Sequence, residues 1–189
     1  MPYKLPSLLY DIPRSLPLAV GLPILLGSLN GRITQKAVKT WYPTLEQPPP
    51  GPPARWVFPV VWTSLYAGMG WAAHVAVKAF DTSARHSVRA AAASSLVLWY
   101  VQFALNMSWT PLFFGAKKTG AAALDIVTLT GTVAALTVKM AHVDRRTLAV
   151  FLPYMAWLSY ASYLNIGVWW LNGGKVKYSR NIKGKGRAE

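Results

Sequence analysis

The sequence contains no cysteine and very few acidic residues. Only six of its 189 residues are Asp or Glu, and charged residues make up 14% of the chain. Without cysteine the chain has no disulfide framework and no thiolate chemistry. Because only Asp125 falls inside an apolar stretch, a mechanism that needs paired carboxylates at membrane depth is excluded as well.

Other catalytic signatures are also missing. The three histidines lie at or near the ends of apolar runs and lack metal-ligand spacing. The sequence has neither a phosphate-binding glycine loop nor a nucleophile elbow. We therefore predict no catalytic residues, no metal site and no obligatory cofactor. A cleavable signal peptide is not expected either, since Pro13, Pro17 and Pro23 interrupt the first apolar run.

Hydrophobic residues, tryptophan and basic residues are abundant. The chain is 53% hydrophobic, has nine Trp and carries a net charge of +14. The Lys and Arg residues cluster between apolar segments, which is typical of membrane proteins and not of a basic face on a soluble domain. The expected partner is therefore a lipid bilayer and not a nucleic acid.

The apolar stretches predict an all-α membrane protein, a bundle of five transmembrane helices. They fall at residues 16–31, 56–80, 88–115, 120–141 and 147–172, between a Pro-rich head (1–15) and a basic tail (173–189) that we expect to be disordered. Residues 32–55 are expected to form the longest loop, stiffened by the proline run at 48–53. In the first run, Gly27 and Gly31 have the spacing that lets another helix approach closely, although they also fit an ordinary helix end.

The end of the third run, residues 104–115, is the most informative stretch. Asn106 and Trp109 share a helix face with Gln102. In a bilayer the amide of Asn106 can be a buried hydrogen-bonding group, and Pro111 is tolerated when a neighbouring helix satisfies the carbonyl it leaves free. We expect the other helices to pack around this one.

Each intramembrane polar residue has two interpretations. Asp125 is either a polar contact at one end of a cavity or a hydrogen-bonded structural group near a helix start. Asn106 and Asn165 contact a ligand or form interhelical hydrogen bonds.

The tryptophans fall into two groups. Trp62, Trp109 and Trp157 lie on helix faces with polar neighbours and could line a pocket for a flat apolar ligand. Trp41 and Trp56, together with Trp169 and Trp170, are predicted to lie in aromatic belts at the membrane interfaces.

Five spans place the two termini on opposite sides of the membrane. The loops on the side of the head carry eight Lys and Arg residues, and those on the side of the tail carry the other twelve of the 20. This distribution favours a cytosolic C-terminus.

Four ordered motifs between about residues 20 and 172 resemble the TspO/MBR family, the translocator proteins once called peripheral-type benzodiazepine receptors. The motifs are Trp41-Tyr42 with Leu45 and Pro48; Pro52-Pro53 with Trp56-Val57-Phe58, Trp62, Leu65-Tyr66 and Met69-Gly70; Ala104-Leu105-Asn106 with Trp109, Pro111 and Phe113-Phe114-Gly115; and Pro153-Tyr154 with Ala156-Trp157-Leu158, Ala161, Leu164-Asn165 and Trp169.

The resemblance implies a five-helix bundle, often a homodimer, with a pocket opening toward the first loop. Such a pocket binds protoporphyrin IX, haem-like tetrapyrroles and benzodiazepine-type ligands. Residue by residue, the implied ligand-binding set is Phe58, Trp62, Asn106, Trp109, Trp157, Ala161 and Leu164, with Asp125 matching a family Asp early in the fourth helix. The resemblance also implies the mitochondrial outer membrane, with secretory membranes as the alternative in plants.

Three departures from the family pattern bear on function. Pro48-Pro49-Pro50 replaces the family's Pro-Ser-Trp, Ala121 replaces a Trp that often opens the fourth helix, and Ile166 and Trp170 occupy the Tyr and Arg positions of the cholesterol motif. We therefore expect porphyrin handling or a stress-response role and no dedicated steroid-precursor role. The alternatives are a light-dependent porphyrin-degrading enzyme, a transporter of porphyrin or lipid, and an interaction scaffold.

Overall fold

The computed structural model describes residues 6–51, 53–54 and 56–172. Over these residues the chain is all-α and has no strand, which confirms the all-α part of the predicted fold class. The elements are α1 (Ser7–Arg14), α2 (Leu16–Thr40), η1 (Tyr42–Thr44), α3 (Val57–Thr82), α4 (His86–Thr110), η2 (Pro111–Gly115), α5 (Thr119–Val143), η3 (Arg145–Thr147) and α6 (Leu148–Leu171). The basic tail, residues 173–189, lies outside the described residues.

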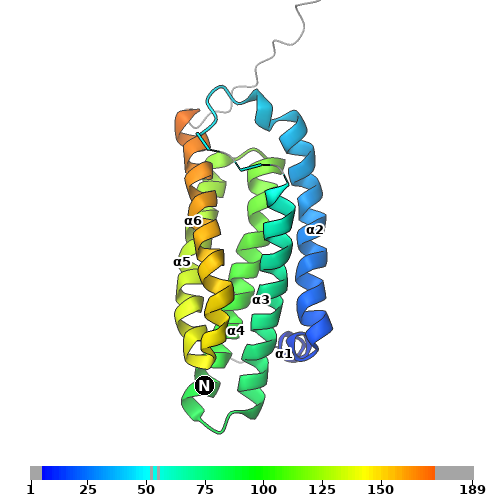
Figure 1. Ribbon diagram of the computed structural model, residues 1–189, viewed down its shortest axis with the longest axis vertical. Helices are drawn as coiled ribbons and strands as arrows, with labels where there is room; N and C mark the ends of the chain where they lie inside the picture. Colours follow the sequence, from blue (N-terminus) through cyan, green and yellow to red (C-terminus); the bar gives the residue numbers. More distant parts are fainter. Residues whose placement is uncertain (1–5, 52, 55, 173–189) are drawn as a thin grey trace, which may run out of the picture.

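The long helices run along one axis, whereas α1 lies across one end of the bundle (Figure 1). Successive helices pack side by side: α2 with α3, α3 with α4, α4 with α5 and α5 with α6. A further contact between α3 and α6 brings these two distant segments together. The largest buried cluster therefore lies among α3, α4, α5 and α6.

Among the described residues, three segments are long and apolar enough to cross a membrane: Leu16–Thr44, His86–Gly115 and Thr119–Val143. Outward-facing residues such as Leu124, Val138 and Leu152 are large and apolar, as expected on a surface that contacts lipid. The chain is thus a membrane protein with several apolar helices.

Helix α2 continues to Thr40, so the prediction that it ends at Gly31 and that a loop begins at Arg32 is wrong. The apolar run does stop at Gly31, but hydropathy marks where a helix leaves an apolar environment and not where its hydrogen bonding ends. The extension is held by Ala37, which is buried in a cluster with Trp41 and Phe113.

Trp41 is buried and does not belong to an interfacial belt. Its ring packs edge-on against Phe113 and Phe114, with centroids 5.6 and 6.3 Å away. Trp56, Trp169 and Trp170 are exposed, as a belt requires. The sequence could not separate these cases because the partners of Trp41 lie about 70 residues further along the chain.

Close packing of α2 against α3 depends on two glycines. A Cβ at Gly27 would lie 2.0 Å from the Tyr66 ring, and one at Gly70 would lie 2.1 Å from the Ala19 main-chain oxygen. Gly31 has no atom within 4 Å of the corresponding position. The close approach expected of the Gly27 and Gly31 pair is therefore confirmed at Gly27 only.

Candidate functional site

A small cavity lies inside the bundle between α3, α4, α5 and α6. It has room for roughly one water molecule. Its lining residues are Trp62, Tyr66, Asn106, Trp109, Thr110, Ile126, Leu129, Leu158 and Ala161. Four of the eight predicted site residues thus line one cavity: Trp62, Asn106, Trp109 and Ala161.

A chain of hydrogen bonds crosses the cavity wall and joins three helices. The Tyr66 hydroxyl donates to the Asn106 side-chain oxygen, and the Asn106 amide donates to the Tyr154 hydroxyl, each over 2.8 Å. The Tyr154 hydroxyl in turn donates to Gln102 Oε1 over 3.0 Å. Asn106 is 3% exposed, so this network fixes a polar group in an apolar interior. The structural interpretation of Asn106 is confirmed, and the residue also faces the cavity.

Trp109 is held in place by a second pair of hydrogen bonds. Its indole Nε1 donates to Asn165 Oδ1 over 2.9 Å, and the Asn165 amide donates to the Thr119 main-chain oxygen over 2.9 Å. The ring also stacks on Phe113 with centroids 5.1 Å apart. Asn165 therefore forms interhelical hydrogen bonds and orients one aromatic wall of the cavity.

Three further aromatic rings form a seam between α3 and α6. Trp157 meets Phe58 and Trp62 edge-on, with centroids 5.8 and 6.4 Å away, and Trp62 also stacks on Tyr66 at 5.5 Å. The indole Nε1 of Trp157 is buried and finds no acceptor among the described residues. Phe58 and Trp157 thus stand beside the lining residue Trp62 without lining the cavity themselves.

Asp125 and Leu164 also lie outside the cavity lining. Asp125 accepts a hydrogen bond from the Ser108 hydroxyl over 2.8 Å, which ties α5 to α4. Its second carboxyl oxygen is buried without a hydrogen-bond partner in the described part of the chain. Leu164 is half-buried on α6. Ligand contact by these two side chains stays a prediction.

Sequence reasoning missed Tyr66, Thr110, Ile126, Leu129 and Leu158 as lining residues. Tyr66 adjoins the helix face that carries Trp62, and Thr110 follows Trp109 directly. The apolar residues gave no signal, because an Ile or Leu beside a cavity is indistinguishable in sequence from one in solid core.

The proline-rich segment closes the end of the bundle near this seam. Tyr160 and Tyr163 of α6 donate to the main-chain oxygens of Gly51 and Pro50, over 2.5 and 3.3 Å. Asn172 both accepts from the Gln47 N–H and donates to the Gln47 oxygen. The first loop is thereby fastened to the same helix that carries Trp157 and Ala161.

No group of three or more His, Asp or Glu side chains within the described residues could hold a metal ion. The cavity is therefore built from aromatic, aliphatic and amide groups. Such a lining can enclose a flat apolar molecule and direct a few hydrogen bonds at it.

Several known proteins are similar in sequence to this chain over most of its length. It is 36% identical to Translocator protein of Bos taurus over 149 residues, covering 78% of this chain and 84% of the bovine protein. It is 36% identical to Protein CrtK of Rhodobacter capsulatus over 135 residues, covering 71% and 80% of the two chains. Tryptophan-rich protein TspO of Chlorobaculum tepidum is 33% identical over 159 residues, or 84% of this chain and 96% of that protein. The family model for the TspO/MBR family matches residues 19–171. Those residues include the whole cavity lining and the aromatic seam, and the chain belongs to the TspO/MBR family.

Proposed function

We propose that all five long helices, including α3 and α6, cross the bilayer. At about 1.5 Å per residue, the 26 residues of α3 and the 24 of α6 each exceed the roughly 30 Å hydrocarbon thickness. α6 contains no Asp, Glu, Lys or Arg, and α3 contains none before Lys78. Their many Trp, Tyr and Gly residues lower their hydropathy without adding a charge.

We propose further that the bundle interior binds a flat apolar ring, with tetrapyrroles such as protoporphyrin IX or haem as the ligand class. The observation that carries this proposal is the convergence of Trp62, Trp109 and Ala161 on one cavity. Aromatic faces stack on planar rings, and Ala161 leaves space where a larger side chain would fill it. Among the described residues the buried Trp157 N–H has no hydrogen-bond acceptor, so it can donate to a polar substituent of the ligand when the ring contacts around Trp157 open.

Binding requires the seam between α3 and α6 to open, because the cavity in this structure has room for about one water molecule. The seam consists of ring contacts among Phe58, Trp62 and Trp157, which are individually weak and can slide. Ligand affinity then depends on the free energy needed to separate the seam.

The test is a titration of the detergent-purified protein with protoporphyrin IX, followed by Trp fluorescence quenching. Ala161→Phe fills the cavity and should weaken binding at least about tenfold. Ala135→Phe is the matched control, since Ala135 is exposed on α5 and should leave affinity unchanged. Equal affinity in all three proteins would show that the ligand binds elsewhere. Quenching that never saturates would show that the ligand only partitions into the detergent and the protein surface.

For location we propose the mitochondrial outer membrane, which rests on the family resemblance, with the C-terminus in the cytosol, which rests on the distribution of Lys and Arg between the two sides. Because relatives from bacteria also match the chain, the organelle needs a direct test. A C-terminal epitope tag in intact mitochondria should be cleaved by added protease without detergent. Protection of the tag would show that the C-terminus lies on the other side of the membrane. Detection of the protein in secretory membranes would show that the proposed organelle is wrong.

A further inference from the structure

Helix α1 is a feature of this chain that the family match does not include. The match begins at residue 19, whereas α1 spans Ser7–Arg14. The helix lies across the end of the bundle, next to the start of α2 and the end of α3 (Figure 1). Its orientation therefore differs from that of every long helix.

One side of α1 is packed on the bundle. Pro13 is buried, and the Tyr10 ring stacks on Phe80 of α3 with centroids 5.1 Å apart. The hydroxyl of Tyr100 on α4 donates to the Leu9 main-chain oxygen over 2.7 Å. These contacts tie α1 to two of the long helices.

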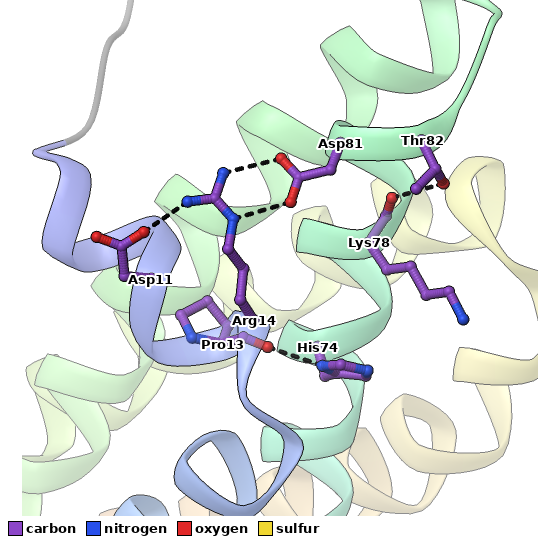
Figure 2. A network of polar contacts seen from close by, with 7 residues as sticks. All are labelled: Asp11, Pro13, Arg14, His74, Lys78, Asp81 and Thr82. Carbon is purple, nitrogen blue, oxygen red and sulfur yellow. Dashed lines mark hydrogen bonds and ion pairs between the residues drawn. The ribbon is translucent and has the colours of Figure 1, made fainter.

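A polar clasp holds the C-terminal end of α1, as Figure 2 shows. The Arg14 guanidinium donates two hydrogen bonds to the Asp81 carboxylate, both over 2.9 Å, and a third to Asp11. The imidazole Nδ1 of His74 lies 2.8 Å from the Pro13 main-chain oxygen. A bidentate Arg–carboxylate pair has a fixed geometry, so the clasp sets the rotation of α1 about its own axis.

The remaining surface of α1 has a polar side and an apolar side. Ser7, Asp11 and Arg14 recur at four and three residues and share one side, whereas Leu8 and Ile12 share another. Leu8 is 63% exposed. The exposed apolar surface continues along the chain through Leu16 and Leu18 of α2, a segment apolar enough to span a membrane.

We propose that α1 lies in the headgroup layer of the bilayer that α2 crosses, with Leu8 and Ile12 at the acyl boundary. A short helix that lies in the membrane plane, with separate apolar and polar sides, is the form that interfacial helices take. The clasp to Asp81 orients it, so that Ser7 faces water while Leu8 faces lipid. This inference concerns the membrane surface and does not depend on the ligand.

Because the chain has no cysteine, single cysteines can be introduced and labelled with an environment-sensitive fluorophore. Leu8→Cys reports the apolar side and Ser7→Cys, the adjacent residue, is the matched control for the polar side. Val138→Cys, on the lipid-facing surface of α5, is the reference for full lipid contact. The proteins are placed in phosphatidylcholine nanodiscs, with or without a lipid that carries a nitroxide near the headgroup end of its acyl chain.

The expected result is opposite quenching at two neighbouring positions. The nitroxide lipid should quench the label at residue 8 about threefold more than the label at residue 7. Aqueous iodide should quench the label at residue 7 more than the label at residue 8. Equal iodide quenching at both positions would overturn the proposal. Protection of residue 8 from both quenchers would also overturn it, since a protein surface and not lipid would then cover Leu8.

A second variant tests the clasp. Arg14→Gln in the Leu8→Cys and Ser7→Cys backgrounds removes the paired hydrogen bonds, and the two labels should become more alike in both quenching assays. The Arg14→Gln protein should elute from a size-exclusion column as the parent does. If it does so and the difference in quenching between residues 7 and 8 stays unchanged, Asp81 does not orient α1.

Discussion

The side-chain amide of Asn30 on α2 donates a hydrogen bond to the main-chain oxygen of Met107 on α4, over 2.9 Å. Residue 111 is a proline and has no N–H to offer that oxygen four residues before it. The chain then forms a π-turn over Pro111–Gly115, in which the Ala116 N–H donates to the Pro111 oxygen. The sequence-based expectation that a neighbouring helix satisfies the freed carbonyl is confirmed, and Asn30 is the donor.

This relationship predicts a rescue. Asn30→Ala leaves the Met107 carbonyl without its donor and should destabilise the protein by about 1–2 kcal/mol. In the Pro111→Ala background a main-chain N–H is restored, so Asn30→Ala should cost clearly less there. Thermal unfolding of the four proteins in one detergent gives the coupling. Equal costs of Asn30→Ala in both backgrounds would contradict the assignment.

Substitution of two helix glycines should have opposite effects on stability. Gly70→Ala places a Cβ 2.1 Å from the Ala19 main-chain oxygen, so α2 and α3 must separate, at a cost of about 1–3 kcal/mol. Gly131→Ala meets no atom within 4 Å and should be neutral or stabilising by up to about 1 kcal/mol. Thermal unfolding in detergent measures both. A similar loss at both positions would indicate that helix flexibility, and not the close contact, makes Gly70 necessary.

The Tyr154 hydroxyl should matter for both stability and ligand binding. Tyr154→Phe removes the group that accepts from Asn106 and donates to Gln102, leaving two buried amides with a missing partner. We expect a loss of about 1–3 kcal/mol in unfolding free energy. Tyr163→Phe is the control, because that side chain is 48% exposed and its hydroxyl loses only one long, exposed hydrogen bond, to the Pro50 oxygen over 3.3 Å.

If the network also positions Asn106 at the cavity, protoporphyrin IX affinity should fall in Tyr154→Phe at temperatures where the variant is fully folded. An affinity equal to that of the parent would show that the network supports the fold without shaping the proposed pocket.

Asp144 predicts an acid-sensitive step in stability. It lies in the loop before η3, where hydrogen bonds from the Arg146 side chain and then its main-chain N–H hold the pKa of the carboxyl below its usual value near 4. Because the folded state keeps this group ionised to lower pH than the unfolded state does, its contribution is complete above the ordinary pKa. The contribution is lost as the pH falls through the lowered value.

The measurement is the melting temperature between pH 6 and pH 3, in the parent and in Asp144→Asn. The variant should lose less of its melting temperature on acidification than the parent. Parallel curves would assign the acid sensitivity to other groups.

Several features could be predicted from the sequence because they depend on local pattern. Continuous apolar runs of roughly 20 residues become helices in a bilayer, since a helix satisfies its backbone hydrogen bonds within a single segment. The need for a partner to the Met107 carbonyl follows from Pro111 alone. The four lining residues that were predicted, Trp62, Asn106, Trp109 and Ala161, came from helical spacing combined with the family resemblance.

Other features depend on contacts between distant segments. Hydropathy gave no indication that α2 continues past Gly31, because Ala37 is stabilised by Phe113 and Phe114, which lie far along the chain. The sequence of the head shows only that it is Pro-rich, whereas in the structure residues 7–14 are helical and are held by Phe80, Asp81 and Tyr100.

Composition and residue spacing are enough to establish that this chain is helical, enters a membrane and belongs to one family, because they are properties of single segments. Which side chains meet is known only once the helices are packed: Asn30 with Met107, Tyr154 between Asn106 and Gln102, and Arg14 with Asp81. These pairings depend on the rotation and offset of each helix against its neighbours. Rotation and offset are set by packing over the whole bundle, which no single stretch of sequence encodes.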